Sequence, residues 1–273
     1  MTCQTCGNIH QENFCPNCGE KIFNSHELSF GHYVGEVFEG LAHFDNKFFR
    51  TVRVLLRRPG QLSLDYTNGR RVRYVKPVQL FVIINLLCFF LLPANPYSQP
   101  LFSYLNYAPI GKARVAALTE KRTKQLNMSE AAYEQLFDEK IKSESKEFIF
   151  LFLPLYALIF AGLFIRQKRK FVEYLVFATH FYSFMLVYFF ISYYLIRLPF
   201  YLITRKQYSN GFDLLLSYLT MAVIFVYLFL AIRRYFRPHL LWTIISSGLV
   251  AYSFFFFIQY YRVLLFYKII FLG

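Results

Sequence analysis

Long apolar runs are the feature of this chain that most limits its fold. Five of them cover residues 74–93, 148–165, 171–196, 212–232 and 239–258. A helix of about 20 apolar residues spans the hydrocarbon core of a bilayer and satisfies its own backbone hydrogen bonds there. The chain is 56% hydrophobic and 21% aromatic, more than a soluble domain of 273 residues usually carries. The pattern predicts an all-α integral membrane protein with about five transmembrane helices, which form a domain over residues 74–273.

Four of the five cysteines form a metal-binding pattern near the start of the chain. Cys3, Cys6, Cys15 and Cys18 follow the spacing C-x2-C-x8-C-x2-C, which brings four thiolates within reach of one tetrahedral Zn²⁺. Four cysteine ligands close the coordination sphere, so we predict a structural zinc ribbon over residues 1–25. A redox dithiol would usually show a single CxxC in a βαβ setting, and a catalytic zinc would keep one position open. His10 and His26 are alternative ligands, which we interpret as surface histidines.

The same cysteines indicate the side of the membrane on which the ribbon lies. Metal-binding thiols must stay reduced, and oxidising compartments convert such thiols to disulfides. The sequence around them also lacks the basic, apolar and small-residue regions of a secretory signal. We therefore expect a cytoplasmic N-terminus.

Residues 28–73 form an amphipathic, basic juxtamembrane segment. Apolar residues recur at helical spacing up to Leu56, and Asp45 is a suitable N-cap for a helix that starts near Asn46. The sequence RRPG at 57–60 ends this helix, and a short helix follows up to Gly69. The basic residues of this region are Lys47, Arg50, Arg53, Arg57, Arg58, Arg70, Arg71, Arg73 and Lys76. We interpret the segment as lying on the membrane with its cations facing anionic lipid headgroups; a solvated basic face is the alternative.

The remaining charges agree with five spans and a cytoplasmic N-terminus. The cytoplasmic connections are then RQKRK (166–170) and RRYFR (233–237), which are short and basic as the positive-inside rule requires. An extracytoplasmic loop covers residues 94–147, where acidic and basic residues nearly balance; a helix capped by Ser129 is predicted in it. The C-terminus is then extracytoplasmic. Much of the formal charge of +14 is explained in this way, and the ribbon holds only Lys21 as a cation, so we do not expect nucleic acid as a partner.

Two stretches of the sequence carry a recognisable motif. The motif residues of the first stretch are Phe44, Asp45, Thr51, Leu55, Leu56, Arg58, Pro59, Gly60, Tyr66, Gly69, Arg71 and Pro77, and those of the second are Glu173, Phe177 and His180. With these residues the chain resembles a bacterial family, domain of unknown function 3667, whose members join a zinc ribbon to a multi-pass membrane region. Tyr174 departs from the family pattern, because a histidine is usual there. The resemblance implies a location in the bacterial inner membrane. It implies no activity.

Polar side chains inside apolar runs are costly and often functional, which makes Glu173 and His180 candidates for proton transfer. They lie seven residues apart, on one face of a helix. The arginines Arg58, Arg70, Arg71 and Arg73, with Asp45 upstream, are a candidate phosphate site because guanidinium groups match phosphate geometry. The alternatives are a buried His180 hydrogen-bonded to a neighbouring helix, a Glu173 paired with Arg169 or Lys170, and arginines that serve only as a positive-inside anchor.

The sequence contains no nucleophile elbow, P-loop, dinucleotide fingerprint or HExxH motif. Function therefore stays open, and whether the chain catalyses a reaction is uncertain. The interpretation that we favour is a membrane-anchored interaction or scaffold protein, with a cytoplasmic structural zinc ribbon that docks a protein partner and a basic, lipid-facing surface. One alternative is a small transporter or lipid-handling protein that uses Glu173, His180 and the arginines. Another is a membrane enzyme acting on a phosphorylated lipid.

Overall fold

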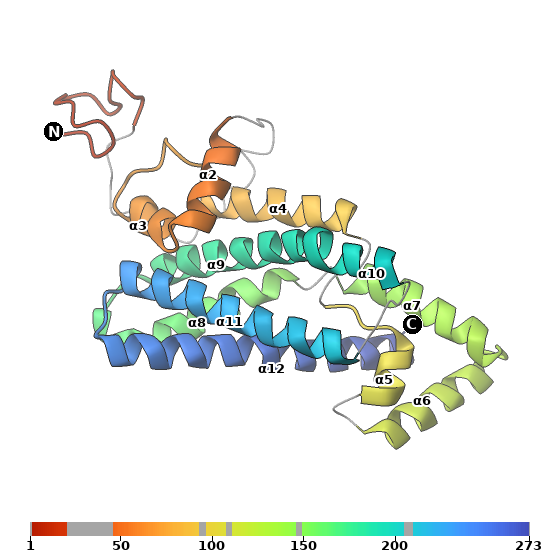
Figure 1. Ribbon diagram of the computed structural model, residues 1–273. Coiled ribbons are helices and arrows are strands. Elements are labelled where there is room, and N and C mark those ends of the chain that lie inside the picture. The colour runs from red at the N-terminus through yellow and green to blue at the C-terminus, as the bar shows by residue number, and fades with distance from the viewer. Residues whose placement is uncertain are drawn as a thin grey trace. The chain divides into compact units, whose positions relative to one another are not determined.

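The computed structural model describes residues 2–20, 46–92, 97–107, 111–145, 149–204 and 210–272 (Figure 1). Within these ranges the regular elements are helices, and an isolated bridge joins Thr2 to Ile9 in the ribbon. The predicted all-helical fold is confirmed for this part of the chain. The chain divides into two compact units, one made of Met1–Phe90 and Leu153–Ala251 and the other of Leu91–Phe152 and Tyr252–Gly273.

Two short helices follow the ribbon in the first unit. Helix α2 covers Asn46–Arg57 and helix α3 covers Gln61–Thr67. The predicted start near Asn46 and the break at RRPG are confirmed, because Gly60 takes a left-handed φ of 78° that turns the chain between the helices. Asp45, the predicted cap, and residues 28–45 of the juxtamembrane segment lie outside the described residues, as does His26.

The helical body of the first unit is built around α9. This helix covers Phe171–Ser192 and continues through a π-helical turn, Tyr193–Arg197, into α10, Leu198–Thr204. Every residue from Tyr174 to Val187 is buried, so α9 forms the core of the unit. The other helices are α4 (Pro77–Leu91), α8 (Phe152–Leu163), α11 (Asn210–Tyr235) and α12 (Leu240–Leu272).

In the part of the chain that the structure describes, three helices are long and apolar enough to cross a membrane. They are Phe171–Thr204, Gly211–Tyr235 and Leu240–Phe271. Helices α4 and α8 are apolar but only 15 and 12 residues long, short of the roughly 20 that a span needs. The structure thus has three candidate spans, and the crossing of the membrane by α4 and α8 stays a prediction. Helix α8 begins at Phe152, so Pro154 lies in its first turn, where a proline is tolerated because the first amides of a helix have no intrahelical partner.

The second unit contains α5 (Leu101–Tyr107), α6 (Lys112–Gln125) and α7 (Glu130–Glu144), together with the last turns of α12. The predicted cap is confirmed, since the Ser129 hydroxyl accepts a hydrogen bond from the amide of Ala132. Helix α7 buries Tyr133, Phe137 and Ile141, so one of its faces belongs to the core of this unit. Phe137 packs against Tyr104 and Phe266. The path of residues 259–272, which the sequence left open, is a continuation of α12.

Candidate functional site

The four ribbon cysteines form one compact cluster. Their Sγ atoms lie within 4.8 Å of one another, with 3.5 Å between Cys3 and Cys18 and 3.6 Å between Cys6 and Cys15. Zn–S bonds of about 2.3 Å in a tetrahedron separate sulfur atoms by about 3.8 Å, so the arrangement fits one metal ion. The amides of Gly7 and Gly19 donate to the carbonyl oxygens of Cys3 and Cys15, which folds each Cys-x-x-Cys pair into a tight turn.

The thiol pKa values show why this cluster suits a cation. Burial raises the pKa of Cys15, but the amides of Cys18 and Asn17 outweigh it and lower the pKa to about 6. The Glu20 amide lowers the pKa of Cys18, but burial and the three neighbouring sulfur atoms raise it to about 12. The four thiols cannot all ionise so close together without a positive charge between them. A divalent ion supplies that charge.

His10 lies beside this cluster without joining it. The residue is buried, and its Nδ1 is 2.9 Å from the carbonyl oxygen of Glu12. The interpretation of His10 as a surface histidine is therefore wrong. Its ring helps to close the loop between the two cysteine pairs.

Glu20 connects the ribbon to the loop between α3 and α4. Its side chain is only 4% exposed, and its carboxylate accepts hydrogen bonds from the Thr5 hydroxyl and from the amides of Arg71 (3.2 Å) and Val72 (3.4 Å). The Glu20 carbonyl oxygen also accepts from the Cys15 amide. Glu20 is thus hydrogen-bonded both to the backbone of a cysteine of the cluster and to the basic loop. Neither Glu20 nor Thr5 was among the residues singled out from the sequence.

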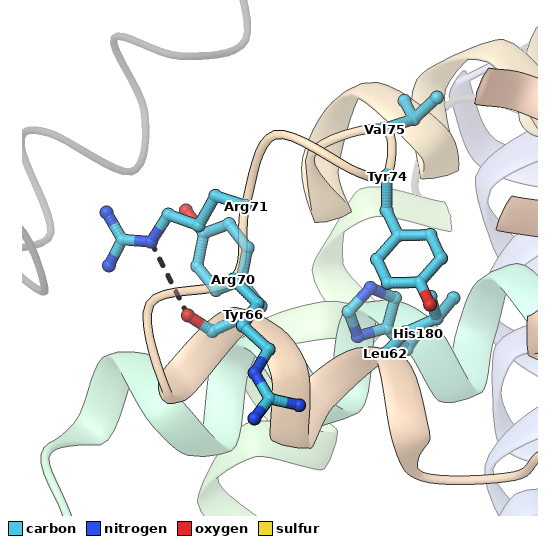
Figure 2. Close-up of a pocket in the computed structure, with 7 residues that line it drawn as sticks. All are labelled: Leu62, Tyr66, Arg70, Arg71, Tyr74, Val75 and His180. Carbon is cyan, nitrogen blue, oxygen red and sulfur yellow. Dashed lines mark hydrogen bonds between the residues drawn. The ribbon is translucent and has the colours of Figure 1, made fainter. Parts of the chain in front are cut away.

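A small pocket lies where this loop meets α3 and α9. Its cavity volume is about 10 Å³, and it is lined by Leu62, Tyr66, Arg70, Arg71, Tyr74, Val75 and His180 (Figure 2). His180 is 4% exposed, and its Nδ1 shares a hydrogen bond of 2.9 Å with the hydroxyl of Ser63. Figure 2 shows both guanidinium groups directed away from the His180 ring. Arg71 lies over the Tyr66 ring, and Arg70 is 3.6 Å from Asp65.

The structure brings only some of the predicted site residues together. His180, Arg70 and Arg71 line the pocket, whereas Arg58 and Arg73 are exposed outside it and Asp45 lies outside the described residues. Glu173 forms a 2.8 Å ion pair with Arg169, and its carboxylate also accepts from the Lys170 amide. Both anticipated alternatives, an interhelical His180 and a paired Glu173, are the contacts observed. The described residues do not unite Glu173 and His180 in one acid–base site.

Cations from separate parts of the chain gather at one end of the first unit. Figure 1 shows α2 and α3 beside the end where α9 begins, α11 finishes and α12 begins. Arg234 donates to the carbonyl oxygen of Pro59 (2.6 Å), and Arg169 donates to that of Tyr235. We call the exposed cations of this end the basic collar: Lys47, Arg50, Arg53, Arg57, Arg58, Arg70, Arg73, Arg166, Lys168, Lys170, Arg233 and Arg237. Two described acids on the helices of this end, Asp65 and Glu173, have basic partners.

Comparison with known proteins finds a family match over the segment that carries seven of the twelve collar cations. Residues 45–89 match the model of a family described as "Protein of unknown function (DUF3667)". The match covers α2, α3, the basic loop and most of α4, and it is about one sixth of the chain. No curated protein and no solved structure matches the sequence. Over α2 to α4 the chain is therefore similar to a family whose function its description leaves open.

Proposed function

We propose that this chain is a membrane-anchored interaction protein of the bacterial inner membrane whose basic collar binds anionic lipid headgroups on the cytoplasmic side. The gathering of exposed cations at one end of the three long apolar helices is the observation that carries this proposal. Each Lys or Arg near an anionic membrane surface contributes about 1 kcal/mol of attraction. A collar of this size therefore fixes the orientation of the helices, with the N-terminus in the cytoplasm and the C-terminus on the opposite side.

The proposal assigns a structural Zn²⁺ to Cys3, Cys6, Cys15 and Cys18. Four thiolate ligands favour zinc over harder cations and leave no position open for a substrate. The ion would supply folding energy to a module that has no apolar core of its own.

The proposal also gives the ribbon a protein partner. Ile9 and Phe14 are 80% and 56% exposed on the ribbon, an unusual position for large apolar side chains in so small a module. The direct test is a pull-down with the full chain and with I9S/F14S, scored for proteins that the wild type retains and the variant loses. An identical set of retained proteins would argue against the partner.

The two alternatives receive less support from the pocket. A cavity of about 10 Å³, which has room for about one water molecule, lies far below the roughly 300–1,000 Å³ of most small-molecule sites. A proton-transfer site also needs the acid or base within hydrogen-bond reach of the group that binds phosphate. The guanidinium groups of Arg70 and Arg71 are instead directed away from His180.

The lipid proposal can be tested with the chain's single tryptophan. Trp242 lies at the collar end, where its Nε1 donates to the carbonyl oxygen of Leu163. Full-length protein in nanodiscs of phosphatidylcholine with increasing brominated phosphatidylglycerol should show stronger quenching of Trp242 than with brominated phosphatidylcholine. Replacing Arg53, Arg57 and Arg58 by Gln should remove the difference. The matched control replaces Lys121, Lys124 and Lys142, exposed cations of the second unit, and should leave it unchanged. Equal quenching by both lipids in the wild type would overturn the proposal.

A further inference from the structure

The contact between Glu20 and the loop after α3 has the form of a bound anion. Two consecutive backbone amides, those of Arg71 and Val72, point at one carboxylate. Consecutive amides that converge in this way form a concave site for anions, and phosphate commonly occupies such sites. Glu20 is almost fully buried there, so the site is shaped and desolvated around a negative group.

The flanking side chains favour an anion as well. Arg70 and Arg73 are exposed on either side of the amide pair, and Arg71 lies between them. The same arginines belong to, or adjoin, the basic collar to which we assign headgroup binding. The carboxylate of Glu20 therefore occupies a place that would suit a lipid phosphate.

The ribbon as a whole is complementary in charge to this loop. A Zn²⁺ ion bound by four thiolates leaves a net charge of about −2. Glu12 and Glu20 add negative charge, and residues 2–20 contain no Lys or Arg. Metal loading thus makes the ribbon an anionic module that faces a cationic loop.

Metal loading also determines where Glu20 is held. The Glu20 amide donates to Cys18 and the Thr5 amide to Cys3, while the Thr5 hydroxyl donates to the Glu20 carboxylate. Both residues that form the anionic contact are therefore fixed by hydrogen bonds to the metal-binding sulfur atoms. A ribbon without metal lacks a core that could keep them in place.

We propose that the Arg71–Val72 amide pair is an anion-binding site of the collar, that the metal-loaded ribbon docks there through Glu20, and that headgroup phosphate competes with Glu20 for it. This inference rests on the proposed lipid binding by the collar. Its consequence is that zinc loading weakens anionic lipid binding. If the docked state holds 90–99% of the molecules, the apparent affinity for lipid falls about 10- to 100-fold.

The test compares Glu20→Gln with Glu12→Gln in the zinc-loaded, full-length protein. Both substitutions remove one negative charge from the ribbon, but Glu12 is exposed whereas Glu20 contacts the loop. Zinc content is measured first to show that each variant stays loaded. Thr5→Val is a second variant, which removes one donor to Glu20 and leaves the cysteines intact.

Two readouts separate docking from lipid binding. Amide hydrogen exchange at Arg71 and Val72, in phosphatidylcholine nanodiscs, reports docking alone. We expect exchange at least about 10-fold faster in Glu20→Gln, a smaller change in Thr5→Val and none in Glu12→Gln, since hydrogen bonds to a charged group are stronger than those to a neutral one. Quenching of Trp242 by brominated phosphatidylglycerol reports lipid affinity, which should rise at least about fivefold in Glu20→Gln.

Removal of zinc by a chelator should raise the lipid affinity of the wild type by about the same factor as Glu20→Gln does. It should raise the lipid affinity of Glu20→Gln little further. Unchanged or weaker lipid binding by loaded Glu20→Gln, or an equal gain in Glu12→Gln, would overturn the competition. Inorganic phosphate added to the protein in phosphatidylcholine nanodiscs tests whether a free anion displaces Glu20 from the amide pair. If inorganic phosphate displaces Glu20 and phosphatidylglycerol does not, the lipid headgroup is not the competitor. If no form of the protein prefers phosphatidylglycerol, the proposed function fails, whereas the exchange data still decide whether Glu20 docks.

Discussion

The Arg-Pro-Gly turn offers a sharp test of how the collar is attached to the helical body. Gly60 has a φ of 78°, and a Cβ placed on it would lie 2.6 Å from the Ala231 carbonyl oxygen and 3.0 Å from the Ala231 Cα. These atoms belong to the backbone of α11 and cannot move aside cheaply. The left-handed conformation alone costs a residue other than glycine about 1–2 kcal/mol.

The clash adds to this strain. Any shift of the turn away from α11 weakens the 2.6 Å hydrogen bond from Arg234 to Pro59, and such charged hydrogen bonds contribute about 1.5–3 kcal/mol. We expect Gly60→Ala to destabilise the first unit by about 3–5 kcal/mol. Thermal unfolding followed by the fluorescence of Trp242 measures the effect, since this residue lies in the same unit.

Two other glycines separate the contributions. Gly7 lies in the same unit and has a φ of 77° with no atom within 4 Å of the added Cβ, so Gly7→Ala isolates conformational strain. Gly162 lies in α8 with open space around it, and Gly162→Ala should be neutral or stabilising by up to about 1 kcal/mol. If Gly60→Ala is no more harmful than Gly7→Ala, the close approach of the turn to α11 does not exist and the reasoning fails.

Three further predictions concern the collar end and the ribbon. Ser63→Ala should cost about 1–3 kcal/mol in thermal unfolding, because it leaves the buried His180 without its interhelical bond, whereas Ser217→Ala on the exposed face of α11 should cost little; equal losses would contradict the role of Ser63. Arg169→Ala should lower the unfolding temperature more than Arg166→Ala, since only Arg169 pairs with Glu173, donates to Tyr235 and stacks on its ring. Zinc affinity, measured with a chromophoric chelator, should fall as the pH is lowered: Cys18, with a pKa of about 12, must lose a proton to bind metal, and Cys15, with a pKa of about 6, gains one below that pH. An affinity that is the same at pH 8 and pH 5 would refute this.

Features with a short range in sequence were predictable. The cysteine cluster follows from two Cys-x-x-Cys turns, the start of α2 at Asn46 and its end at Arg57 follow from local helix signals, and the Ser129 cap follows from a preference of the N-cap position. The apolar runs predicted α9, α11 and α12 for the same reason. A bilayer selects on length and hydropathy, and both are properties of a continuous segment.

Features that join distant segments could not be predicted in this way. The sequence of α9 is apolar, but nothing in it indicates that His180 would meet Ser63 of α3. In the sequence, Glu20 is an acidic residue after a glycine with no recognisable motif around it. Its contact with the amides of Arg71 and Val72 depends on the tertiary structure. The positive-inside rule predicts that the basic connections lie on one side of the membrane. That α2 and α3 lie beside these connections follows from the contacts of Pro59 and Gly60 with α11, which the sequence does not show.

The sequence by itself determined the kind of protein this is, namely apolar helices with a four-cysteine ribbon and a basic segment between them. Those properties depend on composition and on spacings of a few residues, which the chain carries before it folds. The tertiary structure decided which polar groups meet: Glu20 with the amides of Arg71 and Val72, His180 with Ser63, and Glu173 with Arg169. Such pairings depend on how helices pack against one another, and a linear pattern of polar and apolar residues does not specify which faces come into contact.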